Sequence, residues 1–198
     1  MSDELIFRSI VIIGFILMSC IGGYHRLMAA RSKEEISRKA EGKVIFIALR
    51  LFGFCFFASL VTYMVNPEGM AWSSLQIPIG LRWLGTVLEV VGISLLYWAL
   101  HNLGKNLTDT VVTREKHTLV TVGPYRWVRH PLYVVFLTLS IAFSMVASNW
   151  AMGLAAVLAF IVIAARTSIE EEMLVERFGD EYREYMGRTG RFLPRLFR

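Results

Sequence analysis

The chain has 198 residues, of which 55% are hydrophobic and 19% charged, and its mean hydropathy is +0.51. Soluble domains carry about 25% charged residues, so this composition excludes an ordinary soluble protein and favours one that lies in a membrane. We expect the formal net charge of +5 to reflect membrane topology and attraction to anionic lipid headgroups, and not binding to nucleic acid.

Apolar runs predict five membrane-spanning helices. A run of roughly 18 or more apolar residues is long enough to cross a bilayer. The last apolar stretch is too long for one span, and Ser148-Asn149 at its midpoint favours a turn, so we expect a tight hairpin of two short helices there. The five expected spans are residues 6–24, 44–65, 79–100, 132–147 and 150–165.

The positions of Lys and Arg predict the orientation. The first loop, the third loop and the C-terminal tail are basic, whereas residues 66–78 and the hairpin turn contain no Lys or Arg. By the positive-inside rule the N-terminus is outside and the C-terminus cytosolic. Arg82, just inside the outer end of the third span, fits this pattern poorly. Residues 29–43 are expected to form a short interfacial helix.

The expected spans contain one carboxylate, Glu89, and two cysteines, Cys20 and Cys55. Glu89 is in the middle of the third span, where a carboxylate is costly, so we expect it to be protonated or paired with a basic or amide group. Cys20 and Cys55 are expected to be buried packing residues. No metal-ligand spacing and no disulfide framework is evident in the sequence.

The tail begins inside the fifth span, where Arg166 is followed by a run of three glutamates, 170–172. Gly179 is expected to break this helix and Asp180 to cap the next one. That last helix, which contains Tyr182 and Tyr185, is expected to lie against the membrane or against the third loop.

The segment 117–133 is polar, basic and punctuated by Gly and Pro, and such loops commonly carry binding and catalytic residues. The hairpin returns the chain to the face it left, so Arg129-His130 and Arg166…Glu171 are expected at the same cytosolic edge. Pro131 fits the first position of a helix, whose N–H groups favour an anion.

These residues resemble the isoprenylcysteine carboxyl methyltransferase family and its relatives among the phospholipid methyltransferases. The resemblance extends over about residues 100–194. The matching motifs are His117-Thr118-Leu119-Val120, Gly123-Pro124-Tyr125-Arg126-Trp127, Arg129-His130-Pro131-Leu132-Tyr133, Arg166-Thr167, Glu170-Glu171-Glu172 and Phe178-Gly179-Asp180-Glu181-Tyr182.

The resemblance implies S-adenosylmethionine as cofactor and a lipid-attached, prenylcysteine-like carboxylate as methyl acceptor, with membrane lipids as surroundings and no metal. It implies that Arg166 holds the acceptor and that Arg166 and Glu171 form the catalytic pair. Which of the three glutamates contacts the cofactor stays open, with Glu171 preferred by its spacing from Arg166. The implied cofactor-binding residues are His117, Thr118, Leu119, Val120, Tyr125, Arg129, His130, Pro131, Leu132 and Glu171.

We therefore expect an all-α, polytopic membrane methyltransferase with one domain over residues 1–198, in which 1–78 are scaffold spans and 100–194 form the catalytic region. A carboxylate acceptor is already ionised at neutral pH and needs no general base. A phospholipid amine N-methyltransferase would share this scaffold, but the carboxylate-binding character of Arg166 disfavours it. A sterol-reductase-like NADPH enzyme and a non-enzymatic membrane scaffold are weaker interpretations of the same sequence.

Overall fold

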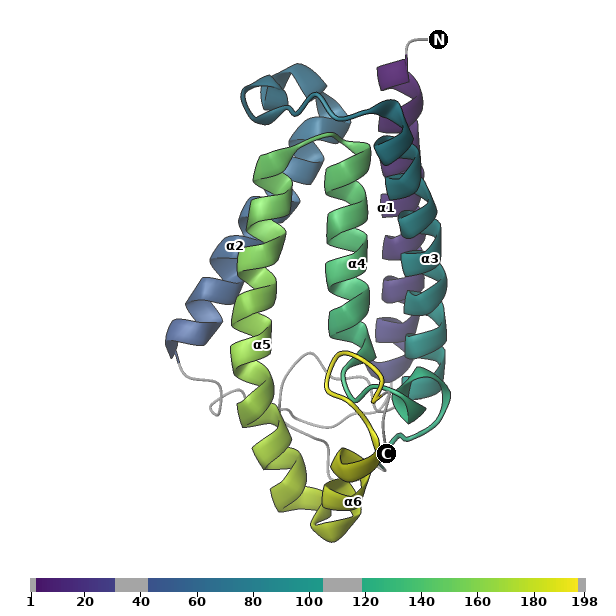
Figure 1. The fold of residues 1–198 in the computed structure, drawn as a ribbon, viewed down its shortest axis with the longest axis vertical. Helices are drawn as coiled ribbons and strands as arrows, with labels where there is room; N and C mark the ends of the chain where they lie inside the picture. Colours follow the sequence, from purple (N-terminus) through teal and green to yellow (C-terminus); the bar gives the residue numbers. More distant parts are fainter. Residues whose placement is uncertain (1–2, 31–42, 105–118, 196–198) are drawn as a thin grey trace.

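Four helices run side by side along the long axis of the molecule, and a fifth, α2, is inclined to them (Figure 1). The computed structural model describes residues 3–30, 43–104 and 119–195, and these ranges contain no strand, so the predicted all-α fold is confirmed. The elements are α1 (Asp3–Ala30), α2 (Lys43–Val65), the 3-10 helix η1 (Pro67–Ser73), α3 (Ile79–Leu103), the 3-10 turn η3 (Gly123–Arg126), α4 (Pro131–Val146), α5 (Trp150–Phe178) and α6 (Asp180–Arg188).

The chain is a multi-pass membrane protein. Helices α1, α2, α3 and α5 are long and apolar enough to cross a membrane, whereas α4 is a shorter apolar helix of 16 residues. At 1.5 Å per residue α4 is about 24 Å long, as expected for a short arm of the hairpin. The second arm is longer than the expected span of residues 150–165, because α5 has 29 residues and continues as far as Phe178, where the expected break at Gly179 follows. The expected interfacial helix at 29–43 lies mostly outside the described residues.

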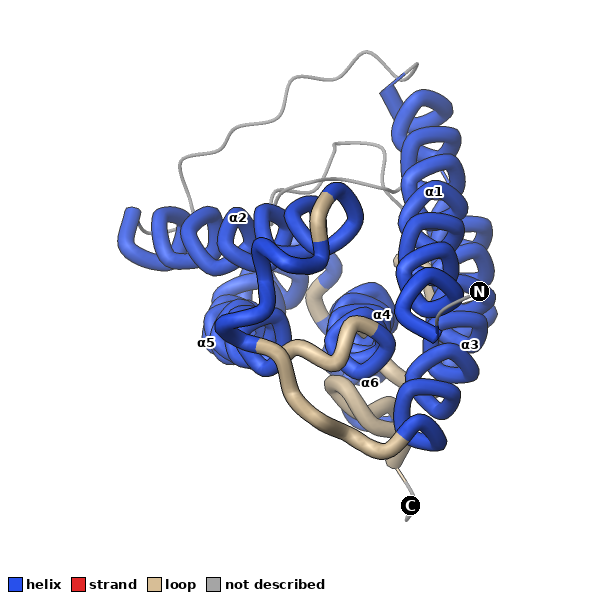
Figure 2. The backbone as a smooth tube through the Cα atoms, turned by 90° about the horizontal axis from the view of Figure 1, so that it is seen from above, coloured by secondary structure: helices blue, strands red, loops and turns tan. Residues whose placement is uncertain are grey.

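Helix α4 occupies the middle of the bundle, between α5 on one side and the α1–α3 pair on the other (Figure 2). Its sequence is apolar on every side, which is typical of a helix surrounded by other helices. Val135, Leu139 and Phe143 of α4 are buried in one core with Phe7 and Val11 of α1. Helix α2 packs mainly on α5.

Glycines let α3 approach its neighbours closely, as small residues commonly do between membrane helices. A Cβ on Gly85 would lie 2.8 Å from Met145 Cβ, and one on Gly92 would lie 2.6 Å from Leu139 Cδ2. The buried carboxyl of Glu89, also on α3, occupies the space beside Gly14 of α1. Glu89 Oε2 has no hydrogen-bond partner among the described residues, so the structure shows no basic or amide partner for that oxygen.

Arg82, which fits the charge pattern poorly, ties four helices together at the end of the bundle near the N-terminus. Its guanidinium donates to Glu4 Oε2 at 2.9 Å, to the Tyr63 hydroxyl at 3.3 Å and to the Val146 carbonyl at 2.8 Å. The Tyr63 hydroxyl in turn donates to Glu4 Oε1 at 2.6 Å. The Glu4 carboxylate balances the charge of Arg82, and the Val146 carbonyl at the end of α4 accepts from it. These contacts account for a basic residue at this position.

The predicted turn between α4 and α5 is confirmed. Ser148 has a positive φ of 53°, and the Asn149 side chain caps α5 by accepting from the Met152 N–H at 3.1 Å. Asn149 also donates to Ser73 Oγ at 2.7 Å, which fastens the turn to η1. This attachment fixes the level at which α5 starts, and hence where its far end lies.

The expectation that Cys20 and Cys55 are buried is wrong, because both are exposed on their helices. Lipid tails are as apolar as a protein core, so an apolar side chain in a membrane helix is equally suited to either surrounding. Hydrophobicity alone therefore does not predict which face of a span is buried.

We predict that Gly85→Ala lowers the free energy of unfolding by about 1–3 kcal/mol, the usual cost of overpacking. The new methyl group would meet Met145 Cβ and, at 3.1 Å, the backbone nitrogen of Val146, and neither can move without shifting α4. The matched control is Gly80→Ala on the same helix, where a Cβ meets nothing within 4 Å. Thermal unfolding in detergent measures both variants, and equal midpoints would contradict the close α3–α4 contact.

Candidate functional site

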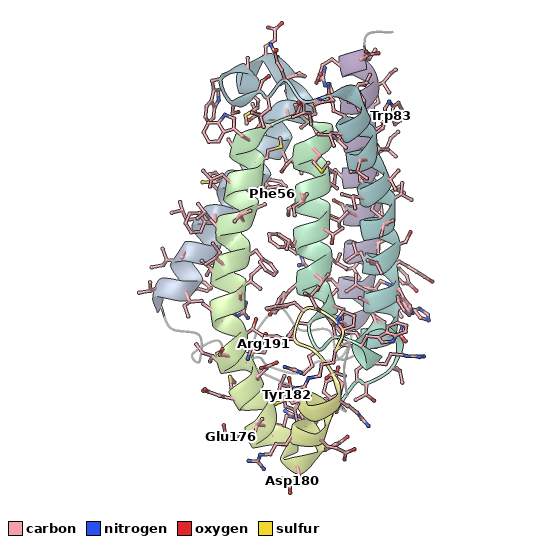
Figure 3. All side chains as sticks on the ribbon, in the orientation of Figure 1. Phe56, Trp83, Glu176, Asp180, Tyr182 and Arg191 are labelled. Atoms are coloured by element: carbon pink, nitrogen blue, oxygen red, sulfur yellow. The ribbon has the colours of Figure 1, made fainter. Side chains whose placement is uncertain are left out.

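Three segments meet at the end of the bundle that carries α6: the start of α4, the end of α5 and the residues that follow α6. Figure 3 shows Tyr182 of α6 and Arg191, which follows α6, at this end of the bundle. We call residues 189–194 the strap.

The loop before α4 is built on α3 and α6. Gly123 has a φ of 61° and lies so close to the Asn102 side chain that a Cβ would collide with it, so glycine is required there. The buried Tyr185 of α6 donates its hydroxyl to the Tyr125 carbonyl at 2.6 Å. This contact confirms that the last helix lies against the third loop.

The strap runs alongside this loop. The Gly190 N–H donates to the Trp127 carbonyl at 3.2 Å, the Arg129 N–H to the Gly190 carbonyl at 2.9 Å and the His130 N–H to the Arg191 carbonyl at 3.1 Å. The chain reaches this position because α5 ends at Gly179, whose φ is 58°, and α6 turns back beneath it. These pairs place the strap beside the first turn of α4.

The break at Gly179 is confirmed, but the expected capping role of Asp180 is wrong. Gly179 is the N-cap of α6, and Asp180 is the first helical residue. The Asp180 carboxylate instead accepts from Arg183 Nη1 at 2.8 Å on the surface. The same residue can serve either position, because an acidic side chain is favourable throughout the first turn of a helix.

Glu171 is the centre of the site. Its side chain is buried, and its Oε1 accepts from Arg129 Nε at 2.7 Å and lies 3.3 Å from His130 Nε2. Its Oε2 accepts from Arg191 Nε at 3.0 Å. We call Arg129, His130, Glu171 and Arg191 the Glu171 cluster. A buried carboxylate is costly without partners of opposite charge. The guanidinium groups of Arg129 and Arg191 are such partners, so they favour the ionised form of Glu171.

His130 joins the Glu171 cluster to a second carboxylate. Its Nδ1 lies 3.9 Å from Glu170 Oε1, and its ring stacks on Tyr133 with the planes 6° apart. The Tyr133 hydroxyl donates to Glu170 Oε2 at 2.7 Å. Pro131 is the first residue of α4, as predicted, and His130 is its N-cap residue without a side-chain cap hydrogen bond. Glu172, the third glutamate, is exposed.

Arg166 lies on α5 one turn before Glu170, and its side chain is buried with only 8% exposed. A guanidinium at this depth is unusual for a simple surface anchor. Helical spacing puts Arg166 and Glu170 on the same face of α5. The structure therefore brings Arg166, Glu171, Arg129 and His130 to one end of the bundle, as the sequence predicts.

Two buried tyrosines of α6 belong to this end of the bundle. Tyr182 and Tyr185 are buried. Burial raises the pKa of the Tyr182 hydroxyl above its ordinary value, and the nearby Glu171 carboxylate raises it further, so the phenol stays neutral. Among the described residues the Tyr182 hydroxyl has no hydrogen-bond partner. Buried polar groups usually have a partner, so this hydroxyl is a candidate contact for a ligand.

The other predicted cofactor-binding residues that the structure describes lie in the loop before α4 and in its first turn. Leu119 and Val120 are half-buried in the loop, and Tyr125 is buried in η3. Leu132 packs on the side of α4 that faces Ala29 and Leu100. His117 and Thr118 lie outside the described residues. Their roles stay predictions.

Sequence reasoning missed the strap. Gly187, Gly190 and Pro194 indicate only that the last helix ends, and nothing in their spacing predicts that the chain then pairs with the loop before α4. In the sequence Arg191 is one of several basic residues of the tail that indicate membrane orientation, yet in the structure its guanidinium binds Glu171. The Phe192 ring lies 6.1 Å from that of His130 and 5.4 Å from that of Phe160.

Residues 83–176, which include α4 and the site residues of α5, match the sequence model of the Isoprenylcysteine carboxyl methyltransferase (ICMT) family. The predicted resemblance is confirmed. The human Protein-S-isoprenylcysteine O-methyltransferase is 36% identical over 131 residues, which are 64% of this chain and 46% of that protein. The Cobalt-zinc-cadmium resistance protein CzcN of Cupriavidus metallidurans is 34% identical over 140 residues, 70% of this chain and 58% of that protein.

The fold is also similar to a solved structure of the eukaryotic intramembrane Ras methyltransferase ICMT. The TM-score is 0.53 at 26% sequence identity, over 75% of this chain and 51% of that chain. This chain therefore spans about half the length of these isoprenylcysteine methyltransferases. Within its described ranges, no three His, Cys, Asp or Glu side chains are grouped so that they could hold a metal ion.

We predict that Arg129→Ala destabilises the protein by about 3–5 kcal/mol, the usual cost of removing one partner of a buried ion pair. Arg129 also donates to the Met186 carbonyl at 3.2 Å and to the Thr189 carbonyl, so the variant loses contacts to α6 and the strap as well. The control is Arg183→Ala, whose ion pair with Asp180 is exposed and is expected to contribute at most about 1 kcal/mol. Equal unfolding midpoints for the two variants would contradict the central place of Arg129.

Proposed function

We propose that the chain transfers a methyl group from S-adenosylmethionine to the carboxylate of a lipid-attached, prenylcysteine-like substrate. The observation that carries this proposal is the Glu171 cluster at one end of the apolar spans, with the buried Arg166 on the same helix, one turn before Glu170. The region that supplies Arg129, His130, Arg166 and Glu171 also lies within the stretch that matches the methyltransferase family, whose activity requires a methyl donor.

The donor and acceptor groups at the site fit S-adenosylmethionine. This cofactor presents ribose hydroxyls, amino groups and a carboxylate. Glu171 supplies a buried acceptor for a hydroxyl or amino group, and the Tyr182 hydroxyl has an open hydrogen-bonding position among the described residues. The start of α4, where the His130 side chain makes no cap hydrogen bond, suits an anionic group. We assign the further contacts to His117, Thr118, Leu119, Val120, Tyr125, Arg129, His130, Pro131 and Leu132.

When bound, the cofactor supplies an activated methyl group, so the protein has to position the reactants and exclude water. The residues around Glu171 suit that task. Tyr182 and Tyr185 are buried beneath the site, and the His130–Tyr133 stack lines the start of α4. Bonds from Arg129 and His130 to Glu171 fix the orientation of its carboxylate.

Arg166 is assigned to the acceptor. A guanidinium binds a carboxylate through two parallel N–H groups, which fixes its plane as well as its position. The acceptor carboxylate is ionised at neutral pH, so the site needs no general base for it. A cationic amine would be repelled by Arg166 and would first have to lose a proton, which argues against an amine methyltransferase.

The proposed orientation places α6 and the site in the cytosol and the N-terminus outside, in agreement with the distribution of Lys and Arg. A soluble cofactor then reaches the site from the cytosol, while the lipid chain of the acceptor stays among the apolar spans. We propose one domain, in which residues 1–78 are scaffold and 100–194 are catalytic. The packing of α1 on α3 and α4 agrees with a supporting role.

We predict that His130→Ala and Glu171→Gln each weaken S-adenosylmethionine binding by about 1.5–3 kcal/mol, the cost of a lost hydrogen bond to a charged group. Glu172→Gln is the matched control, because this neighbouring glutamate is exposed. Equilibrium binding in detergent measures all three, with thermal unfolding as the check on folding. Wild-type affinity in both site variants would remove these residues from the cofactor site.

We predict that Arg166→Lys slows methyl transfer at least about tenfold while leaving cofactor affinity nearly unchanged, because lysine keeps the charge but loses the planar fork. The assay is transfer of a labelled methyl group to N-acetyl farnesylcysteine. Equal rates would reduce Arg166 to a charged anchor at the membrane boundary. Activity on phosphatidylethanolamine alone would favour the amine methyltransferase.

A further inference from the structure

Glu171 has no acceptor position left for a ligand in this structure. A carboxylate offers about four lone-pair positions on its two oxygens. Oε1 accepts from Arg129 Nε and contacts His130 Nε2, while Oε2 receives both Nε and Nη2 of Arg191. A hydroxyl or amino group that binds Glu171 therefore has to displace one of these three side chains.

Arg191 is the side chain most easily displaced. The Arg129 side chain is 9% exposed and is also held by two carbonyls of α6 and the strap. The His130 side chain is 5% exposed and stacked on Tyr133. By contrast, the Arg191 side chain is 38% exposed, and partly exposed ion pairs contribute little net stability.

Arg191 has another partner outside the Glu171 carboxylate. Its Nη1 donates to Ser168 Oγ at 3.3 Å, on the exposed side of α5. The strap backbone does not need to move with it, because the Gly190 and Arg191 carbonyls accept from the Arg129 and His130 N–H groups. The Phe192 ring against His130 and Phe160 holds the strap as well. A change of side-chain rotamer is enough to clear Oε2.

We propose that Arg191 is an internal competitor for Glu171: it occupies the ligand-binding side of this carboxylate, as it does in this structure, and swings out when the cofactor binds. The proposal rests on the proposed function, since it takes Glu171 to be a cofactor-binding residue. In this position Arg191 satisfies a buried carboxylate oxygen, Oε2, that has no other partner among the hydrogen bonds of Glu171 described above. The apparent affinity for the cofactor is then lower than the intrinsic affinity, by the fraction of molecules in which Arg191 has left.

The test is calorimetric titration of the detergent-solubilised full chain with S-adenosylhomocysteine, which lacks the sulfonium charge. Arg191→Met keeps the length of the side chain and removes its donors. We expect this variant to bind about three- to tenfold more tightly than the wild type, as for release of a weak competitor. Arg195→Met is the matched control. It makes the same substitution four residues further along the chain, at an arginine that donates to the Gly187 carbonyl and not to Glu171. Its affinity is expected to stay at the wild-type value.

Equal or weaker binding by Arg191→Met would overturn the competitor role, since a positioning residue would lose affinity when removed. If the Met variant does not fold, Arg191→Lys is measured in its place, because lysine has a single ammonium group where arginine has a planar guanidinium. This variant is also expected to bind S-adenosylhomocysteine more tightly than the wild type. Glu171→Gln separates the two proposals: unchanged affinity there would defeat the cofactor role of Glu171 itself. If Arg191 acts through Glu171, Arg191→Met no longer tightens binding in a Glu171→Gln background.

Discussion

A buried carboxylate at the end of α5 is the constraint on which the site depends. An ion of this kind is stable only with opposite charges and hydrogen bonds around it. Glu171 obtains them from Arg129, which precedes α4, and from Arg191, in the strap after α6. Because these three residues are far apart in the sequence, their pairing draws the two hairpin helices and the C-terminal segment into one structure.

The spans set the place where this pairing occurs. Helix α5 has 29 residues and α4 only 16, and both start or end at a turn fastened to η1 through Asn149. The surplus length of α5 carries Arg166 and Glu171 to the end of α4 and beyond it, to the end of the bundle where α6 lies (Figure 1). At the opposite end, Arg82 and Glu4 hold α1, α3 and α4 in register. The described part of the chain is therefore an apolar bundle with polar ties at both ends, and the Glu171 cluster lies at one of them.

The spans, the turn at Ser148 and the meeting of Arg129, His130 and Glu171 could all be predicted from the sequence, because hydrophobic length and a return hairpin are enough to imply them. The exposure of Cys20 and Cys55 on their helices could not be predicted, since lipid and protein interiors are equally apolar. The capping role of Asp180 was wrong because Gly179 ends one helix and caps the next. Arg191 was missed because its partner depends on how the chain folds back after α6, which no local pattern encodes.

We propose that this end of the bundle binds S-adenosylmethionine. The most direct measurement of such binding is a pair of calorimetric titrations of the detergent-solubilised protein, one with S-adenosylhomocysteine and one with NADPH. Saturable binding of S-adenosylhomocysteine alone is the predicted result. Binding of NADPH alone would contradict the claim and favour a reductase, and binding of neither would leave the Glu171 cluster as a structural tie between the hairpin and the strap.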